Sequence, residues 1–224
     1  MKGIAHKNEL GSGFYTVPDI SRLLGFSQDK VRRYLNDYWD DRLGRKLFSD
    51  TYTWSADNRT KAVNFYVLIE LYTFFKLQEF GVKTATILKA RDHMAKETKS
   101  PYPFAANGVL TNGKKIWYEF KDAIIDANGT TQTNFVEMIK DFANKIDFGK
   151  NKLAENFWPA GRNSSVVVNP HNQFGQPIIK GSNVNTEVLF SMYKSGEPIE
   201  SIGILYDLTE SQVQDAVKFY QRAA

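Results

Sequence analysis

The 224-residue sequence predicts a mainly helical fold with small β elements, in the α+β class. Two short segments with helical apolar spacing, residues 17–24 and 28–39, follow one another near the N-terminus. A long apolar stretch at residues 61–80 is typical of a buried helix. Three more short helical patterns, separated by glycine and proline, occupy residues 187–222. Short β-branched and aromatic runs between these segments predict the small β elements.

The first predicted helix spans residues 17–24 and ends at Gly25. Its apolar residues recur three and four positions apart, and proline is compatible with the first turn of a helix: Val17, Pro18, Ile20, Leu23 and Leu24. Ser27 is a candidate N-cap for the second helix, residues 28–39. The residues expected to face inward on that helix are Val31, Leu35 and Tyr38.

The outward face of the second helix is polar and cationic. Two short amphipathic helices of which the second is cationic are typical of a helix-turn-helix that reads the major groove. The candidate DNA-binding residues here are Ser27, Gln28, Lys30, Arg32 and Arg33, with Asn36 on the same face. An ordinary helical hairpin with a solvated basic face is the alternative that spacing alone leaves open.

A basic loop and a strand are expected after this helix pair. Residues 42–48 contain Arg45 and Lys46, and residues 51–54 form a β-branched and aromatic run. Together they predict a small wing whose two cations contact DNA phosphates. A basic surface loop without that function is the alternative.

The next prediction is a long helix over residues 61–80, closed by Gly81. Its apolar residues go nearly all the way round, so we expect it to pack on its own domain and also on a second subunit. The sequence therefore favours a homodimer. A further helix is predicted over residues 82–97, ended by Pro101 and Pro103.

The middle segment, residues 101–148, changes in character. Asn-Gly pairs separate two candidate strands, residues 116–120 and 123–125, and a helix is predicted over residues 135–145. The aromatic residues of the first strand are able to stack on bases, but aromatic residues in strands more often belong to a core. A small antiparallel sheet followed by a connecting helix is the expected outcome.

The last segment, residues 149–224, predicts two short strands and three helices. The strands are residues 166–168 and 177–179, and the helices are residues 187–195, 198–206 and 210–222. Thr209 and Gln212 form a capping-box pattern before the third helix. The residues expected in the helical core are Ile199, Ile202, Leu205, Val213, Ala216, Val217 and Tyr220. Two helices joined by a tight turn predict a homeodomain-like unit.

The excess of positive over negative charge is confined to the first part of the chain. The net charge is +5 for residues 1–100, −1 for residues 101–148 and 0 for residues 149–224. Because Lys and Arg supply most of the non-specific affinity for nucleic acid, the first segment is where a polyanion is expected to bind.

Several classes of function find no support in the sequence. There is no cysteine, and His6, His93 and His171 are isolated from one another. Asp40 and Asp41 are adjacent and point in different directions on a helix end, so we predict no metal site and no cofactor. No nucleophile has a base beside it, and we expect no enzyme.

No membrane segment is expected either. The most apolar stretch, residues 63–75, is too short to cross a bilayer and contains Glu70. The polar residues 1–13 lack the apolar core of a signal peptide. These features predict a cytoplasmic protein.

Two stretches in the first half carry a family resemblance. Residues 15–25 followed by residues 30–35 resemble the DNA-binding helix pair of MerR-like winged helices. Residues 64–72, 80–82 and 87–90 are similar to the N-terminal domain of VapB-type antitoxins. In that family the domain is associated with operator binding, so the resemblance implies that this helix pair reads DNA.

The last segment resembles a small bacterial domain of unknown function found in antitoxins that pair with PIN-like ribonuclease toxins. The matching stretches are residues 166–170, 174–181, 198–202, 206–209 and 213–220. The Phe-Gly-x-Pro-Ile-Ile-x-Gly element at residues 174–181 is the most specific of them. Residues 182–186 depart from the family, because Ser-Asn-Val-Asn-Thr stands where Gly-Thr-Arg-Ile-Pro is usual.

These observations predict a type II antitoxin that binds operator DNA and neutralises a PIN-like ribonuclease toxin. The expected domains are a DNA-binding domain at residues 1–100, a connector at 101–148 and an antitoxin domain at 149–224. A stand-alone MerR-like transcription regulator that senses a small ligand is the alternative. A nucleic-acid-processing enzyme is a third hypothesis, and it would require metal-dependent nuclease activity.

Overall fold

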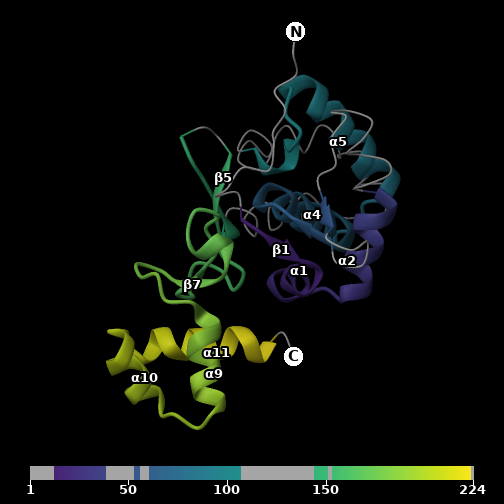
Figure 1. Ribbon diagram of the computed structural model, residues 1–224. Coiled ribbons are helices and arrows are strands. Elements are labelled where there is room, and N and C mark those ends of the chain that lie inside the picture. Colours follow the sequence, from purple (N-terminus) through teal and green to yellow (C-terminus); the bar gives the residue numbers. More distant parts are fainter. Residues whose placement is uncertain (1–12, 39–52, 56–60, 107–143, 151–152, 223–224) are drawn as a thin grey trace.

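The computed structural model describes residues 13–38, 53–55, 61–106, 144–150 and 153–222. These residues are mainly helical, with one three-stranded and two two-stranded antiparallel sheets. In Figure 1 the helices α9, α10 and α11 gather at one end of the molecule, and α4 and α5 lie toward the other. The strand β7 lies next to the C-terminal helices, and β5 lies farther from them, beside α4. The predicted mainly helical class with small sheets is confirmed.

The N-terminal elements place a helix pair beside the three-stranded sheet. They are β1 (Tyr15–Thr16), α1 (Val17–Leu24), α2 (Gln28–Tyr34), β2 (Thr53–Ser55) and β3 (Lys61–Val63), and β3 is the central strand of the sheet. Residues 35–38 continue α2 as a π-helical turn. The α-helical part of α2 is therefore shorter than the predicted span of residues 28–39.

The predicted start of the long helix, at residue 61, was wrong. Residues 61–63 form β3, and the helix α4 (Phe65–Glu79) begins only after Asn64. The side-chain oxygen of Asn64 accepts a hydrogen bond from the backbone N–H of Val67 at 2.9 Å, which caps the helix. Because β3 pairs with both β1 and β2, its backbone groups are satisfied in the sheet.

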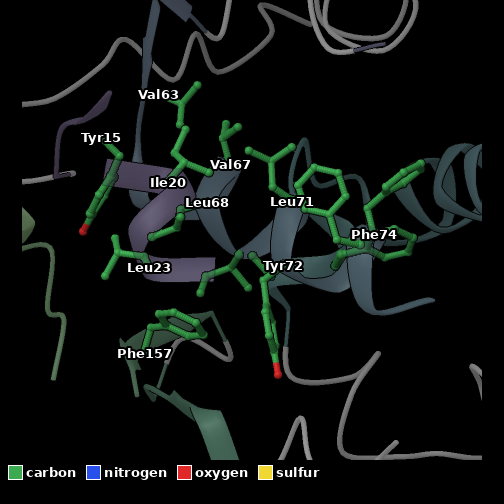
Figure 2. Packing of buried hydrophobic residues seen from close by; sticks show 14 of the residues in the cluster. Tyr15, Ile20, Leu23, Val63, Val67, Leu68, Leu71, Tyr72, Phe74 and Phe157 are labelled. Carbon is green, nitrogen blue, oxygen red and sulfur yellow. The ribbon is translucent and has the colours of Figure 1, made fainter. Parts of the chain in front are cut away.

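The helix α4 is buried on nearly all sides by its own chain. Of its fifteen residues, eleven are buried, and Figure 2 shows its side chains packed between Ile20 and Leu23 of α1 and Phe157 of β5. The rings of Tyr72 and Phe157 lie 5.1 Å apart. Neighbours within one chain thus account for the all-round apolar pattern. The homodimer remains a prediction, and the apolar residues around α4 no longer support it.

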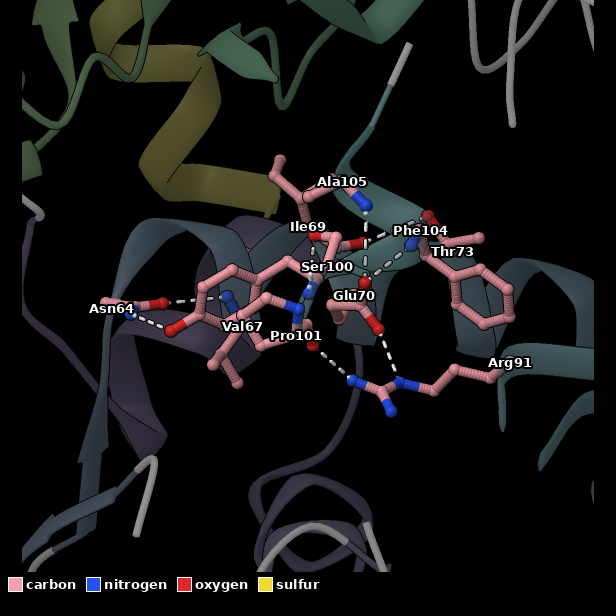
Figure 3. A network of polar contacts seen from close by, with 11 residues as sticks. Asn64, Val67, Ile69, Glu70, Thr73, Arg91, Ser100, Pro101, Phe104 and Ala105 are labelled. Atoms are coloured by element: carbon pink, nitrogen blue, oxygen red, sulfur yellow. Dashed lines mark hydrogen bonds and ion pairs between the residues drawn. The ribbon is translucent and has the colours of Figure 1, made fainter. Parts of the chain in front are cut away.

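A buried ion pair attaches the next helix and the turn after it to α4 (Figure 3). The helix α5 (Thr84–Thr98) supplies Arg91, whose Nε donates to Oε2 of Glu70 at 2.6 Å and whose Nη2 donates to the Pro101 carbonyl at 2.7 Å. The other oxygen of Glu70 accepts from the backbone N–H groups of Phe104 (2.6 Å) and Ala105 (3.3 Å). These two residues belong to the 3₁₀ turn η2 (Pro103–Ala105).

Burial and pairing act in opposite directions on the Glu70 carboxyl. Burial raises the pKa of Glu70, while the Arg91 guanidinium and the two backbone N–H groups offset part of that rise.

Glu70 also bears on the membrane question, because it lies in the most apolar stretch of the sequence. Across the residues described, no helix combines the length and the apolar character needed to cross a bilayer.

A β-hairpin that the sequence did not predict follows in the chain. The strand β4 (Ile146–Phe148) pairs antiparallel with β5 (Ala154–Phe157), and the predicted domain boundary between residues 148 and 149 falls inside this hairpin. The two strands join the core that contains α4. The predicted strands at 116–120 and 123–125, and all but the last two residues of the predicted helix 135–145, lie outside the described residues.

The C-terminal elements agree closely with the prediction. The strands β6 (Val166–Val167) and β7 (Ile178–Ile179) pair antiparallel, with the 3₁₀ turn η3 (Gln173–Gly175) between them. The helices α9 (Thr186–Lys194), α10 (Ile199–Tyr206) and α11 (Glu210–Arg222) follow. The capping box is present, because Thr209 N–H donates to Gln212 Oε1 at 2.9 Å and Gln212 N–H donates back to Thr209 Oγ1 at 3.3 Å.

One predicted core residue of these helices is exposed. Leu205 is 65% exposed, whereas Ile202 is fully buried. The inward stripe of α10 runs through Ile199, Ile202 and Tyr206, so Tyr206 occupies the position expected for Leu205. From Ile202, a spacing of three residues reaches Leu205 and a spacing of four reaches Tyr206, and both spacings fit a helix face. The packing of α10 against α11 partly buries the residue four positions on.

Candidate nucleic-acid interface

Local capping bonds set the α1–α2 pair. Thr16 and Asp19 form a capping box, in which Thr16 N–H donates to Asp19 Oδ2 at 2.9 Å and Asp19 N–H donates to Thr16 Oγ1 at 3.5 Å. Gly25 ends α1 with a left-handed φ of 73°. The Ser21 hydroxyl donates to the Phe26 carbonyl at 2.5 Å and holds the turn. Ser27 then caps α2 by accepting from Lys30 N–H at 3.3 Å, as predicted.

An aromatic cluster holds the inner face of α2 against α4. Val31, Tyr34 and Leu35 are buried. The ring of Tyr34 lies 4.0 Å from that of Phe74 and 5.2 Å from that of Phe75. Packing of this kind fixes the rotation of α2 about its axis. The opposite face of α2 is consequently turned to solvent.

The solvent face of α2 presents most of the predicted DNA-binding residues. Ser27, Gln28, Arg32 and Arg33 are all exposed. Arg32 Nη1 lies 3.0 Å from Asp29 Oδ1, and the two side chains are 50% and 95% exposed. An exposed ion pair contributes at most about 1 kcal/mol, so Arg32 can exchange Asp29 for a phosphate or a base at little cost.

Lys30 differs from the other predicted contacts. Its Nζ lies 4.1 Å from the ring centroid of Phe26 and 4.7 Å from that of Phe75. Burial lowers the pKa of Lys30, nearby Glu79 offsets part of that shift, and the charge of Arg33 adds to it. Lys30 is therefore half-buried in a cation–π contact, and its ammonium group is less available to DNA than those of fully exposed cations.

The predicted wing is described only in part. The strands β2 and β3 pair antiparallel, with Trp54 opposite Ala62, so a strand exists close to the predicted residues 51–54. Arg45 and Lys46 lie outside the described residues. The structure thus brings together the α2 residues and leaves these two cations as predictions.

The Phe-Gly turn of the C-terminal segment contacts the N-terminal strand. Phe14 N–H donates to the Phe174 carbonyl at 3.0 Å. Tyr15 is fully buried, and a Cβ added to Gly175 would lie 2.8 Å from Cζ of Tyr15. No local pattern in the sequence predicts this contact, since it joins residues about 160 positions apart.

The helix α1 and the C-terminal helices also meet directly. The guanidinium carbon of Arg22 lies 4.9 Å from the ring centroid of Tyr220, and that ring stacks on Phe190 at 4.9 Å. Tyr220 belongs to the same apolar core as Ile20 of α1. The helix pair is therefore packed against the C-terminal segment and does not stand apart as a separate module.

A polar cleft of about 450 Å³ lies beside β6 and β7. Trp158 and Lys180 line it, with the Lys180 Nζ 5.1 Å from the indole centroid. Asp147 accepts from the Trp158 Nε1–H at 2.8 Å and pairs with Arg162 at 2.6 Å. Nowhere in the described ranges do three or more His, Cys, Asp or Glu side chains gather closely enough to hold a metal ion.

Comparison with known proteins extends these observations. Residues 166–220 match a family described as "Protein of unknown function (DUF433)". "Putative antitoxin VapB45" of Mycobacterium tuberculosis is 23% identical over 165 residues, which is 67% of this chain and 68% of that protein. The crystal structure of Rv2018 from the same organism has a TM-score of 0.69 at 19% identity, covering 91% of this chain and 96% of the other. The chain is thus a distant homologue of this VapB45 protein, with a DUF433 domain at its C-terminus.

Proposed function

We propose that the chain is the antitoxin of a type II toxin–antitoxin pair, which binds operator DNA and neutralises a PIN-like ribonuclease. The similarity to an antitoxin supports the first part of the proposal. The observation that carries DNA binding is the solvent face of α2, where Gln28, Arg32 and Arg33 are exposed opposite a buried aromatic face. The positive charge of residues 1–100 adds to that argument.

The candidate DNA-binding residues of α2 and of the predicted wing have different roles in the proposed complex. Arg32 and Arg33 pair with guanine edges or with phosphates, and Gln28 pairs with an adenine edge in the major groove. Arg45 and Lys46 hold phosphate from the wing. Lys30 contributes mainly to packing, because its ammonium group lies on two aromatic rings.

The other parts of the proposal concern assembly. Residues 1–100 form the DNA-binding part, residues 101–148 a connector, and residues 149–224 the part that holds the toxin. The C-terminal part has no excess positive charge, which fits a protein partner better than DNA. A homodimer would match the two-fold symmetry that operators commonly have.

The DNA-binding proposal is tested by replacing both exposed arginines. In Arg32→Ala, Arg33→Ala we expect affinity for the DNA upstream of the gene to fall by about 1 to 3 kcal/mol for each arginine that reads a base. An arginine that contacts only phosphate would instead reduce the slope of affinity against salt by about one. A gel-shift titration at several salt concentrations measures both quantities.

A matched control removes two positive charges elsewhere. Lys194 of α9 and Lys218 of α11 are both exposed, so Lys194→Ala, Lys218→Ala carries the same change of net charge as the arginine variant. We expect this control to bind DNA as the wild type does. Equal binding by the arginine variant and the wild type would refute the proposed interface.

A second candidate function is a stand-alone transcription regulator that senses a small ligand. The cleft beside β6 and β7, with Trp158 and Lys180 in its lining, is the observation that favours it. This function requires a ligand that raises the melting temperature of the purified chain and changes its affinity for DNA. It also requires that no toxin gene lie beside this one.

A further inference from the structure

Two large apolar side chains are exposed next to each other on α10. Ile204 is 77% exposed and Leu205 is 65% exposed. Neither contributes to the inward stripe of α10, which passes through Ile199, Ile202 and Tyr206. Among the described residues these are two of the three most exposed large apolar side chains. Adjacent exposed apolar residues of this size commonly mark an interaction surface.

A hollow of about 590 Å³ lies beside Ile204, between α10 and the start of α11. Gly203 lets the turn that follows α10 approach the helix closely, because a Cβ at this position would lie 2.8 Å from the Leu208 carbonyl oxygen. Asp207 ends α10 in the left-handed conformation, with a φ of 54°. The close packing and the short turn fix the shape of the hollow. A side chain of a partner could therefore enter a preformed site.

The rim of this hollow is acidic. Glu200, Asp207 and Glu210 line it and are all exposed. None of the three carboxylates forms an ion pair with another residue that the structure describes. Residues 197–215 contain five Asp and Glu residues and no Lys or Arg. We call Glu200, Ile204, Leu205, Asp207 and Glu210 together the α10 face.

The acidic charge of the α10 face favours some binding partners over others. In a helix-turn-helix the start of the second helix enters the groove, and here that position would bring Glu210 toward phosphate. DNA is therefore a poor match for the α10 face. A symmetric contact between the α10 faces of two copies would place like charges opposite one another, which costs several kcal/mol in a complex. A basic protein surface with a protruding apolar side chain matches both the hollow and its rim.

We propose that the α10 face is the site at which the toxin docks. This inference rests on the proposed function, and it names the surface and the chemistry of the contact. An apolar side chain of the toxin enters the hollow beside Ile204, and Lys or Arg residues around it pair with Glu200, Asp207 and Glu210. The α10 face and the solvent face of α2 are then separate sites for two different partners.

The test uses the 224-residue chain and the purified product of the neighbouring gene, which the proposed function expects to be a PIN-like ribonuclease. Two double variants, Ile204→Ala, Leu205→Ala and Glu200→Gln, Glu210→Gln, are compared with the wild type. Isothermal titration calorimetry measures Kd, and stopped-flow mixing at several salt concentrations measures the association rate. We expect the apolar double variant to raise Kd roughly tenfold or more, as loss of a central anchor does. The charge variant should slow association and reduce its dependence on salt.

Matched controls use Val188 of α9, which is 42% exposed, and Glu155 of β5, which is also exposed. Val188→Ala and Glu155→Gln should bind the toxin as the wild type does. All the replaced side chains are exposed, so each variant should keep the wild-type melting temperature. Unchanged toxin binding by both α10 variants would overturn the α10 assignment alone. Absence of binding by the wild-type chain would overturn the proposed function.

Discussion

Replacing Arg91 by methionine should lower the free energy of unfolding by about 3 to 5 kcal/mol at neutral pH. The variant leaves the Glu70 carboxylate, which is 1% exposed, without its cationic partner. It also removes the bond from Arg91 to the Pro101 carbonyl. Urea unfolding followed by circular dichroism measures the loss.

The cost of Arg91→Met should depend on pH in a defined direction. Burial already raises the pKa of Glu70 in the folded state, and loss of the guanidinium would raise it further. A folded-state pKa above the unfolded value of about 4.3 means that stability falls as pH rises through this interval. The destabilisation should therefore be smaller at a pH near 4 than at a pH near 7.

The ion pair between Lys76 and Glu79 provides the matched control. It joins residues of one helix at 2.8 Å, with the two side chains 22% and 44% exposed. Lys76→Met should cost less than about 1 kcal/mol, because solvent screens the pair. Similar losses in Arg91→Met and Lys76→Met would show that the buried pair does not hold the turn at residues 101–105 to α4.

Replacing Gly175 by alanine should cost about 2 to 5 kcal/mol of stability. Gly175 has a φ of 84°, which alone costs an L-residue about 1 to 2 kcal/mol. The added Cβ would also overlap the hydroxyl of Tyr15 and lie 3.1 Å from Cα of Gly13. Because Tyr15 belongs to the N-terminal strand, the clash would separate that strand from the C-terminal turn.

Gly161 and Tyr15 separate the two contributions. Gly161 has a φ of 85°, and a Cβ there would meet nothing within 4 Å, so Gly161→Ala should show only the backbone cost. Tyr15→Phe should recover part of the loss in Gly175→Ala, since it removes the overlapping hydroxyl. Thermal unfolding of the wild type, Gly161→Ala, Gly175→Ala and the double variant Tyr15→Phe, Gly175→Ala gives these losses of stability. Equal losses at Gly161 and Gly175 would mean that the contact with Tyr15 contributes nothing.

Local signals in the sequence were sufficient for the helix pair and for the C-terminal helices. Gly25, Ser27 and the Thr209–Gln212 box act through bonds to residues within a few positions, so their effect can be predicted from spacing. The start of α4 was missed because the apolar residues of β3 run directly into those of the helix. Asn64, a good N-cap residue, was the signal that separates the two elements.

Long-range packing decides the features that the sequence did not predict. Lys30 was expected to face DNA, but Phe75, which lies 45 positions away, takes part in covering its ammonium group. The exposure of Leu205 depends on how α10 rotates against α11, and the contact of Tyr15 with Gly175 depends on the meeting of two distant segments. Periodicity cannot resolve such choices, because alternative residues satisfy it equally well.

The most direct test of the antitoxin proposal is inhibition of RNA cleavage. The purified product of the neighbouring gene, which the proposal expects to be a PIN-like ribonuclease, is incubated with RNA at a fixed concentration while the 224-residue chain is added in increasing amounts. The proposal predicts that cleavage stops once the chain reaches a stoichiometric amount, both for the wild type and for Arg32→Ala, Arg33→Ala. Cleavage that continues undiminished in a large excess of the wild-type chain would contradict it.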